Sequence, residues 1–393
     1  MKKKLVAALV IAMTMCIFTG CGGDDGDSSS PVSALDPQPI GSEQPDTTDP
    51  VGGSDVESSD ESSEPSEEEN HDNMYRSEIT NEWIDESLRD QRPIAVMVDN
   101  EKVALPHFGL TEADVVYEIM NSTANGRITR FMAIVKDWGR ITQFGSIRSA
   151  RPTNFMLASE WNAVLCHDGG PFYIDDWVKK SYSANLSGGF ARFDNGKKTE
   201  YTEYLTYDTY TNTSKNKTYD GLKQRFEKSK YSTEYNSYYE GPHFKFAGEE
   251  IDFADRSDAK TAVNVELPFP HNRSTLKYNE ETGTYDYYEY GAAHLDPLHD
   301  NAQLTFKNVL LQNTTFSELD QNGYMIYNAI DTSKRSGYYM TNGKAIEIYW
   351  MKSSESGITV YYDKKTGEEI EINTGKTYIS LVPSDGWSDL VIE

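Results

Sequence analysis

The chain has little cysteine and little positive charge for its length, and each shortage excludes a class of protein. Three cysteines in 393 residues exclude a small scaffold held together by several disulfides. Lys and Arg together number 37 against 63 Asp and Glu, which gives a formal net charge of −26. Because a chain this acidic repels phosphate polyanions, we expect no nucleic-acid partner.

Long apolar runs and well-known catalytic motifs are also missing. Only the first 20 residues contain an apolar run that approaches the length of a membrane span. The sequence has no Walker phosphate loop, no GxSxG motif, no HExxH motif and no Cys-x-x-Cys pair. We expect no cofactor, and the sequence leaves open whether the protein is an enzyme.

The N-terminus has the features of an export signal followed by a lipid attachment site. Three lysines at positions 2–4 precede an apolar run over residues 5–18, and Cys21 directly follows a Thr-Gly pair. This order resembles the bacterial lipobox and predicts a lipoprotein signal peptide over residues 1–20. Acyl chains on Cys21 would then anchor the protein at the extracytoplasmic face of the cell membrane, at roughly 0.8 kcal/mol per buried CH₂. Cys16 leaves with the signal, so Cys166 has no intrachain disulfide partner.

An acidic segment follows the lipid attachment site. Residues 22–75 contain 16 Asp plus Glu, no Lys or Arg, and many Ser, Gly, Pro and Thr. Such a segment cannot bury enough apolar surface to offset its ordering entropy, so we predict a disordered tether over residues 21–75. The remaining residues, 76–393, still carry a net charge of −13.

Two folded domains are expected after the tether, over residues 76–240 and 241–393. In the first, short apolar runs typical of buried strands occur at 94–98, 115–117, 128–135, 143–147 and 163–166, with a helix at 152–161. In the second, alternating runs are separated by turn signals such as Asn342-Gly343. The predicted fold class is α+β: a layered α/β domain with a mixed sheet, followed by a β-rich, mainly antiparallel domain.

Polar residues of the first domain fall at the ends of its predicted strands. Asp99 and Glu118 follow two of them, Arg148 and Arg151 follow a third, and His167 follows a fourth. In open α/β sheets, ligands bind in the crevice beyond the carboxyl ends of the strands. If these strands are parallel, the side chains converge on one rim.

The arginines carry the sharpest signal for a ligand. Arg148, Ser149 and Arg151 directly precede Pro152, a residue suited to the first turn of a helix. Two guanidiniums beside the positive end of a helix dipole are unfavourable unless an anion joins them, and Arg matches phosphate or carboxylate bidentately. With Arg130 adding charge, these four residues are the candidate ligand-binding set.

The alternative is a structural network in which Asp99, Glu118 or Asp168 neutralises the arginines. A catalytic interpretation uses the same carboxylates differently: His167 would act as general acid/base, with Asp99 or Glu118 as its partner and Asp168 beside it. Cys166 ends an apolar run and is expected to be a small core residue.

One loop brings potential metal ligands together: His294, Asp296 and His299 lie within six residues. Their spacing matches none of the strong zinc patterns, and Pro297 indicates a loop. We therefore expect hydrogen bonds and no metal there.

With these residues considered together, the chain resembles the YerB-like bacterial lipoproteins, which have two domains of unknown function. The resemblance covers most of residues 90–386. The motifs that carry it are 92–100 (RPIAVMVDN), 109–118 (GLTEADVVYE), 128–133 (ITRFMA), 147–152 (IRSARP), 167–170 (HDGG), 361–363 (YYD) and 373–379 (NTGKTYI). The family's acidic residue before the Ile-Thr-Arg motif is missing, Pro171 replaces a Ser, and a His-containing motif is absent near 203–206.

The resemblance implies a lipoprotein with two domains but supplies no reaction. We expect a membrane-anchored extracytoplasmic protein that binds an anionic envelope ligand, such as a wall glycan, a peptide carboxylate or a polymer phosphate, through its arginines. One alternative is a hydrolase or transferase that acts on the same polymer through His167. The other is a structural adaptor that docks a partner envelope protein.

Overall fold

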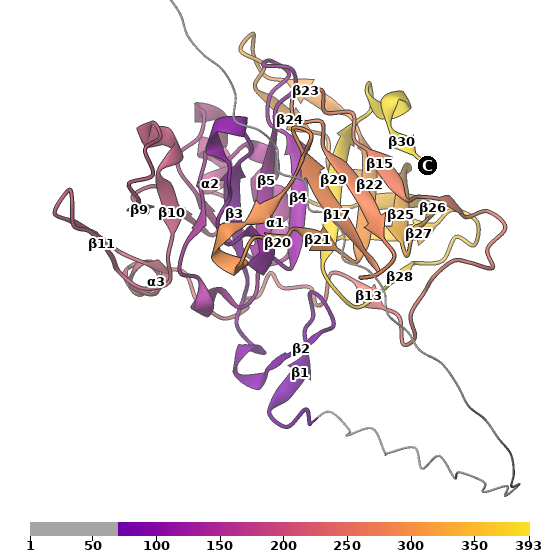
Figure 1. Cartoon of the computed structure of the whole chain (residues 1–393), viewed down its shortest axis with the longest axis horizontal. Helices are drawn as coiled ribbons and strands as arrows, with labels where there is room; N and C mark the ends of the chain where they lie inside the picture. Colours follow the sequence, from indigo (N-terminus) through magenta and orange to yellow (C-terminus); the bar gives the residue numbers. More distant parts are fainter. Residues whose placement is uncertain (1–69) are drawn as a thin grey trace, which may run out of the picture. The chain divides into compact units, whose positions relative to one another are not determined.

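A mixed sheet of eleven strands runs through the part of the chain that the computed structural model describes, residues 70–393 (Figure 1). The predicted signal peptide, Cys21 and most of the predicted tether lie outside these residues. The strands, in order across the sheet, are β14 (Lys260–Thr261), β26 (Lys344–Lys352), β25 (Asp331–Thr341), β22 (Asn308–Thr314), β29 (Thr377–Pro383), β4 (Val115–Met120), β5 (Thr129–Val135), β3 (Ile94–Asp99), β7 (Val164–His167) and β8 (Asn185–Ser187), with β27 (Thr359–Asp363) also paired to β26.

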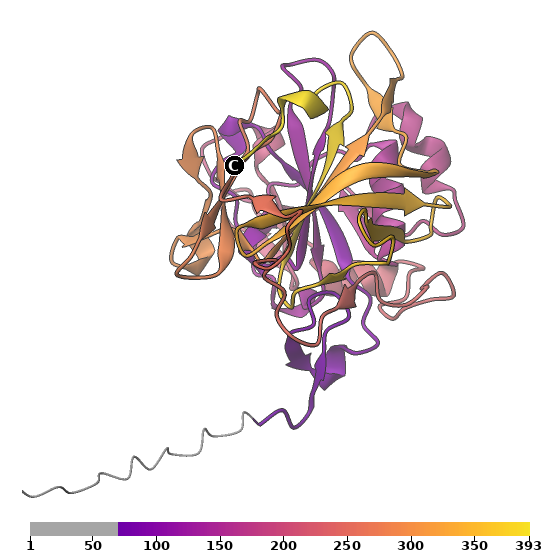
Figure 2. The same cartoon turned by 90° about the vertical axis from the view of Figure 1, so that its right-hand side faces the viewer.

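This central sheet takes strands from both predicted domains. β4 pairs in parallel with β29, with Val115 opposite Thr377, so the sheet continues from one half of the sequence into the other. β22, β29, β4, β3, β7 and β8 share one direction, whereas β5 and β25 run opposite to them. Figure 2 shows the strands fanning out, which is the expected twist of a large sheet. The predicted mixed and antiparallel pairing is confirmed.

A second sheet of six strands covers one face of the central sheet. Its members are β18 (Ala292–Ala293), β17 (Thr284–Glu289), β16 (Thr275–Asn279), β15 (Asn264–Glu266), β30 (Val391–Ile392) and β21 (Thr305–Phe306). Alternate residues of β17 are buried, namely Tyr285, Tyr287 and Glu289. Such alternation places one face of an antiparallel strand against the core and leaves the other toward solvent.

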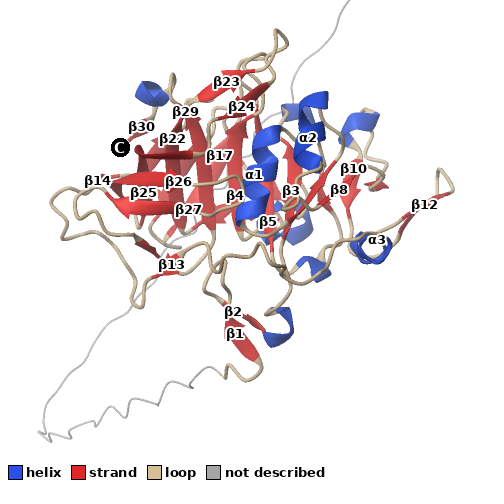
Figure 3. Cartoon of the chain, turned by 180° about the vertical axis from the view of Figure 1, so that it is seen from behind, coloured by secondary structure: helices blue, strands red, loops and turns tan. Residues whose placement is uncertain are grey.

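On the opposite face of the central sheet, α1 (Pro152–Glu160) and α2 (Asp175–Val178) lie over the strands of its first half, β4, β5 and β3 (Figure 3). The α-helices between residues 70 and 393 are few and short, and the third is α3 (Leu222–Lys228). The helix predicted over 152–161 is thus confirmed as α1, but a layered α/β arrangement of the first half is not confirmed. Successive residues of β4 show the two faces: Tyr117 accepts a hydrogen bond from Trp161, the residue that follows α1, while Glu118 contacts the second sheet.

Coverage on both faces explains why the central strands are continuous apolar runs. Every residue of β3, β4 and β5 is buried, as expected for strands packed on two sides. The hairpin predicted at Asn342-Gly343 joins β25 to β26, and both turn residues have positive φ, 48° and 68°. This geometry favours the Asn-Gly pair at the turn.

Short strand pairs complete the described chain. They are β1 (Met74–Arg76) with β2 (Trp83–Asp85), β10 (Glu203–Leu205) with β6 (Phe144–Gly145) and β9 (Ala191–Arg192), β11 (Tyr210–Asn212) with β12 (Lys217–Tyr219), β13 (Lys245–Phe246) with β28 (Glu371–Ile372), β19 (Leu295–Asp296) with β20 (Ala302–Gln303), and β23 (Phe316–Glu318) with β24 (Met325–Tyr327).

Candidate functional site

The carboxyl ends of β3 and β7 form one rim of the central sheet. β3 ends at Asp99 and β7 at His167, and the two strands are parallel. β5 runs the other way, so Arg130, near its start, lies opposite Asp99. The loop that carries Arg148 is fixed to this rim, because its amide donates to the Met97 carbonyl at 3.0 Å. Asp99, Arg130, Arg148 and Arg151 therefore lie together, whereas Glu118 does not join them, and we call these four residues the arginine rim.

Arg148 already has partners on the rim. Its Nε lies 2.6 Å from Oδ2 of Asp99, whose side chain is 1% exposed. Its Nη2 lies 3.3 Å from Glu200, and its guanidinium lies 5.5 Å from the ring centre of Tyr201. Asp99 thus pairs with an arginine, as in the structural alternative.

Arg130 and Arg151 form no such ion pair, although Asp99 and Glu101 lie near enough to Arg130 to counteract part of the fall in its pKa. No carboxylate within residues 70–393 forms an ion pair with either. Arg130 donates to the Ser149 carbonyl at 2.6 Å and Arg151 to the Ala150 carbonyl at 3.0 Å, but the buried Nε of each lacks a hydrogen-bond partner. Burial, followed by repulsion from Arg151, lowers the pKa of Arg130 to about 9.

Arg151 is the residue that precedes α1. Its amide donates to Asn154 Oδ1 at 2.7 Å, which closes the start of the helix. Burial lowers the pKa of Arg151 to about 10, although Tyr324, whose ring centre lies 5.0 Å away, counteracts part of the shift. The positive end of α1 and the arginine rim therefore lie together.

His167 lies at the rim without a carboxylate partner. It is 1% exposed, its Nδ1 is 2.8 Å from the Gly169 carbonyl, and the Asn185 side chain lies near enough to raise its pKa by hydrogen bonding. Burial lowers its pKa, so the ring is neutral at pH 7. Asp168 instead lies 3.5 Å from Arg192. Among the described residues, the His–carboxylate pair of the catalytic interpretation is not formed.

Glu118 does not lie at a strand end, which corrects the sequence-based prediction. β4 extends to Met120, so Glu118 sits inside the strand and faces the second sheet. Its carboxylate accepts hydrogen bonds from Thr129 (2.6 Å), Ser274 (2.6 Å), Tyr378 (2.6 Å) and Tyr287 (2.9 Å). Burial nevertheless raises its pKa. Glu118 is a buried link between the two sheets.

The potential ligands of the His294 loop separate in the structure. Both carboxylate oxygens of Asp296 accept hydrogen bonds, among them one from the Thr111 hydroxyl at 2.7 Å. His299 lies at the surface, 2.9 Å from Glu112. His294 turns inward. The loop residues therefore do not form a common ligand set.

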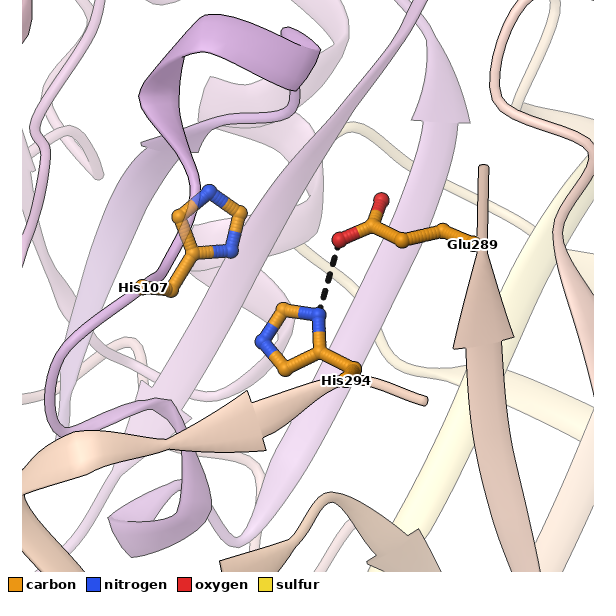
Figure 4. Close-up of side chains that lie close together, drawn as sticks. All are labelled: His107, Glu289 and His294. Atoms are coloured by element: carbon orange, nitrogen blue, oxygen red, sulfur yellow. Dashed lines mark hydrogen bonds and ion pairs between the residues drawn. The ribbon is translucent and has the colours of Figure 1, made fainter. Parts of the chain in front are cut away.

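His294 instead meets two residues that the sequence analysis did not select. Ligand atoms of His107, Glu289 and His294 lie within 4.8 Å of one another (Figure 4). His107 comes from a loop of the first half, which no local pattern connects with the other two. Glu289 could have been predicted from the sequence, because it continues the alternation of Tyr285 and Tyr287 and so places a carboxylate on the buried face of a strand.

Comparison with known proteins shows the family to which the chain belongs. Two family models match: the protein of unknown function (DUF3048) N-terminal domain over residues 79–232 and the DUF3048 C-terminal domain over residues 265–379. The chain belongs to this two-domain family. The arginine rim lies within the first match, and Glu289 and His294 lie within the second.

The chain is also similar, in sequence and in structure, to a protein of Bacillus subtilis. The chain is 25% identical over 325 residues to "Putative lipoprotein YerB" of strain 168, covering 78% of this chain and 85% of the relative. The crystal structure of the YerB protein from Bacillus subtilis matches with a TM-score of 0.65 at 22% identity, covering 81% of this chain and 99% of the other. The chain is thus homologous to a protein named as a lipoprotein and shares its fold. None of the helices between residues 70 and 393 has the length and apolar character needed to cross a membrane.

Proposed function

We propose that this protein is a lipid-anchored extracytoplasmic protein that binds an anionic ligand of the cell envelope at the arginine rim. The observation that carries the proposal is the charge imbalance of the rim. Three guanidiniums gather there, but the buried carboxylate of Asp99 pairs with Arg148 alone. Arg130 and Arg151 have no ion pair with any residue described.

The physical argument is that a buried charge without a partner is expensive. The penalty for taking an ion out of water amounts to several kcal/mol unless a counter-charge and hydrogen bonds compensate it. The unpartnered Nε atoms of Arg130 and Arg151 are two unused donors. An anion between the two arginines supplies both the charge and the acceptors.

The chemistry of the donors favours phosphate or carboxylate. A guanidinium presents two parallel N–H groups that match the oxygens of either group. The ring of Tyr324, which is half-buried next to Arg151, offers aromatic surface against which a sugar ring can pack. A polymer phosphate, a peptide carboxylate or an acidic wall glycan fits these features.

The proposed location rests on the N-terminal pattern and on the relative's name. The apolar run before Cys21 is typical of an export signal, and the homologue is named a lipoprotein. Acylation of Cys21 would keep the rim outside the cytoplasm, where envelope polymers are found. Loss of membrane association and of acyl labelling in Cys21→Ala would support this location, and unchanged labelling would contradict it.

The binding test uses the full chain in detergent, with inorganic phosphate and acetate titrated separately by calorimetry. We compare Arg151→Gln, which leaves no partner carboxylate unpaired, with Arg140→Gln, a control at a side chain that is 81% exposed. Because hydrogen bonds to charged groups contribute about 1.5–3 kcal/mol, we expect a loss of affinity of about 10- to 100-fold in Arg151→Gln alone. Equal affinities in the two variants would refute the proposal.

A further inference from the structure

A second cluster of polar side chains lies inside the protein, away from solvent. The exposed fractions of His107, Glu289 and His294 are 0%, 2% and 3%. His107 belongs to the first family match, whereas Glu289 ends β17 and His294 follows β18 in the second. The cluster therefore connects the two halves of the chain.

The backbone around the cluster is fixed. The His294 amide donates to the Tyr287 carbonyl at 3.1 Å, and its carbonyl accepts from Leu304 at 2.9 Å. Next to His107, Phe108 exchanges two hydrogen bonds with Gly145, at 3.0 and 3.1 Å. The three side chains thus extend from held segments, which is the support that a metal site needs.

Most polar atoms of the cluster lack a hydrogen bond of good geometry. His294 Nδ1 lies 2.8 Å from Glu289 Oε1, but both ring nitrogens of His107, His294 Nε2 and Glu289 Oε2 are buried without one. Against the effect of burial, the Asp99 backbone raises the pKa of His107 and the Asn100 side chain lowers the pKa of Glu289, so each lies near its partner. Buried polar groups in native proteins are nearly always hydrogen-bonded, and each exception requires an explanation. Four buried atoms of the cluster thus have no hydrogen bond of good geometry.

The side chains also point at one another. In Figure 4, a ring nitrogen of His107 and an oxygen of Glu289 face the same space as Nδ1 of His294. The ring of Phe131 closes this space, with centroids 5.8 Å from His107 and 6.1 Å from His294.

We propose that His107, Glu289 and His294 bind a divalent first-row transition metal ion, with Zn²⁺ as the preferred probe. Two imidazoles and one carboxylate suit Zn²⁺ and its neighbours, whereas Ca²⁺ and Mg²⁺ prefer oxygen alone. Around tetrahedral Zn²⁺ at about 2.0–2.1 Å, neighbouring ligand atoms are about 3.3 Å apart. The donor atoms lie within 4.8 Å of one another, so they would have to approach by up to about 1.5 Å to reach this geometry. One coordination position remains for water or another donor.

The complete burial indicates a structural role. A metal held by His107 from one side and by Glu289 and His294 from the other links the first half of the chain to the second sheet. Metal bound to the folded state alone stabilises that state by mass action. Zn²⁺ should therefore raise the melting temperature of the protein, without any need for the arginine rim.

The test measures metal content and melting temperature on the full chain in detergent. The protein is stripped with a chelator, exposed to ZnCl₂, and passed over chelating resin to remove ions held weakly by exposed carboxylates. We expect about one Zn²⁺ per chain and a higher melting temperature than for the stripped protein. Absence of tightly bound Zn²⁺ in the wild-type chain would overturn the proposal.

His299→Gln is a matched control for His107→Gln and His294→Gln. His299 lies five residues after His294 but at the surface, bound to Glu112. We expect the two cluster variants to lose the Zn²⁺ and the thermal shift, and the control to keep both. Equal Zn²⁺ content in His107→Gln and His299→Gln would place the metal elsewhere and refute the assignment.

A measurement on the wild-type chain tests the site even if the variants fail to fold. Co²⁺ replaces Zn²⁺, and X-ray absorption then reports the ligand atoms directly. Scattering from two imidazoles with otherwise oxygen ligands supports the site. A coordination sphere of the metal ion that contains no imidazole refutes the proposed site, regardless of how the variants behave.

Discussion

Replacement of Arg130 by Met separates the two interpretations of the arginine rim. Burial is the main cause that lowers the pKa of Arg130 to about 9, well below the ordinary value of a guanidinium. At 1.36 kcal/mol per unit, the charged form costs about 5 kcal/mol in the folded protein. Loss of the hydrogen bond from Arg130 to the Ser149 carbonyl offsets about 1.5–3 kcal/mol of this. Arg130→Met should therefore stabilise the anion-free protein by about 2 kcal/mol, with the melting temperature raised by about 4 °C.

The assay is thermal unfolding of the full chain in detergent, with and without inorganic phosphate. Phosphate should raise the melting temperature of the wild type more than that of Arg130→Met, because the variant keeps only one of the two arginines that lack an ion pair. The control is Arg127→Met, which breaks a surface ion pair with Asp385 and should cost about 1 kcal/mol or less. If Arg130→Met is less stable than the wild type in the absence of anions, Arg130 stabilises the folded protein by itself, and the argument for an anion at the arginine rim is refuted.

Three further predictions concern the core. Lys352→Met should destabilise the protein by about 3–5 kcal/mol in thermal unfolding, because Lys352 lies 3.0 Å from Glu160 and both side chains are 0% exposed; a change within 1 kcal/mol would contradict this. Burial alone raises the pKa of Glu160, but the neighbouring Lys352 and His243 lower this pKa overall. The stability that ionised Glu160 contributes is therefore complete above about pH 4.5 and is lost as the pH falls below this value. The variant Glu160→Gln should lack this loss of stability in acid. Burial raises the pKa of Cys166 to about 12, so a thiol reagent should label it only after unfolding, and labelling of the native chain would count against a core position.

Local pattern was sufficient for most elements of the central sheet. The apolar run at 94–98 became β3, the run at 128–135 became β5, and Pro152 began α1. These predictions succeed because strand burial and helix starts depend on neighbouring residues. The local pattern gave the wrong position for Glu118, because the carboxylate interrupts the apolar run and was therefore interpreted as the end of the strand. The hydroxyl groups that accommodate it come from Thr129, Ser274, Tyr287 and Tyr378, which are distant in the sequence.

The sequence by itself determined the acidic character, the export and lipidation pattern at Cys21, the strand-rich composition and the presence of arginines before Pro152. Tertiary structure alone decided that Arg130 meets Arg148 and Arg151, since strand direction brings them to one rim. It also decided that one sheet crosses both halves, through pairing of Val115 with Thr377. The approach of His107 to Glu289 and His294 follows from the same packing of distant segments. Such contacts depend on which faces are buried together, and no local spacing in a single chain encodes that choice.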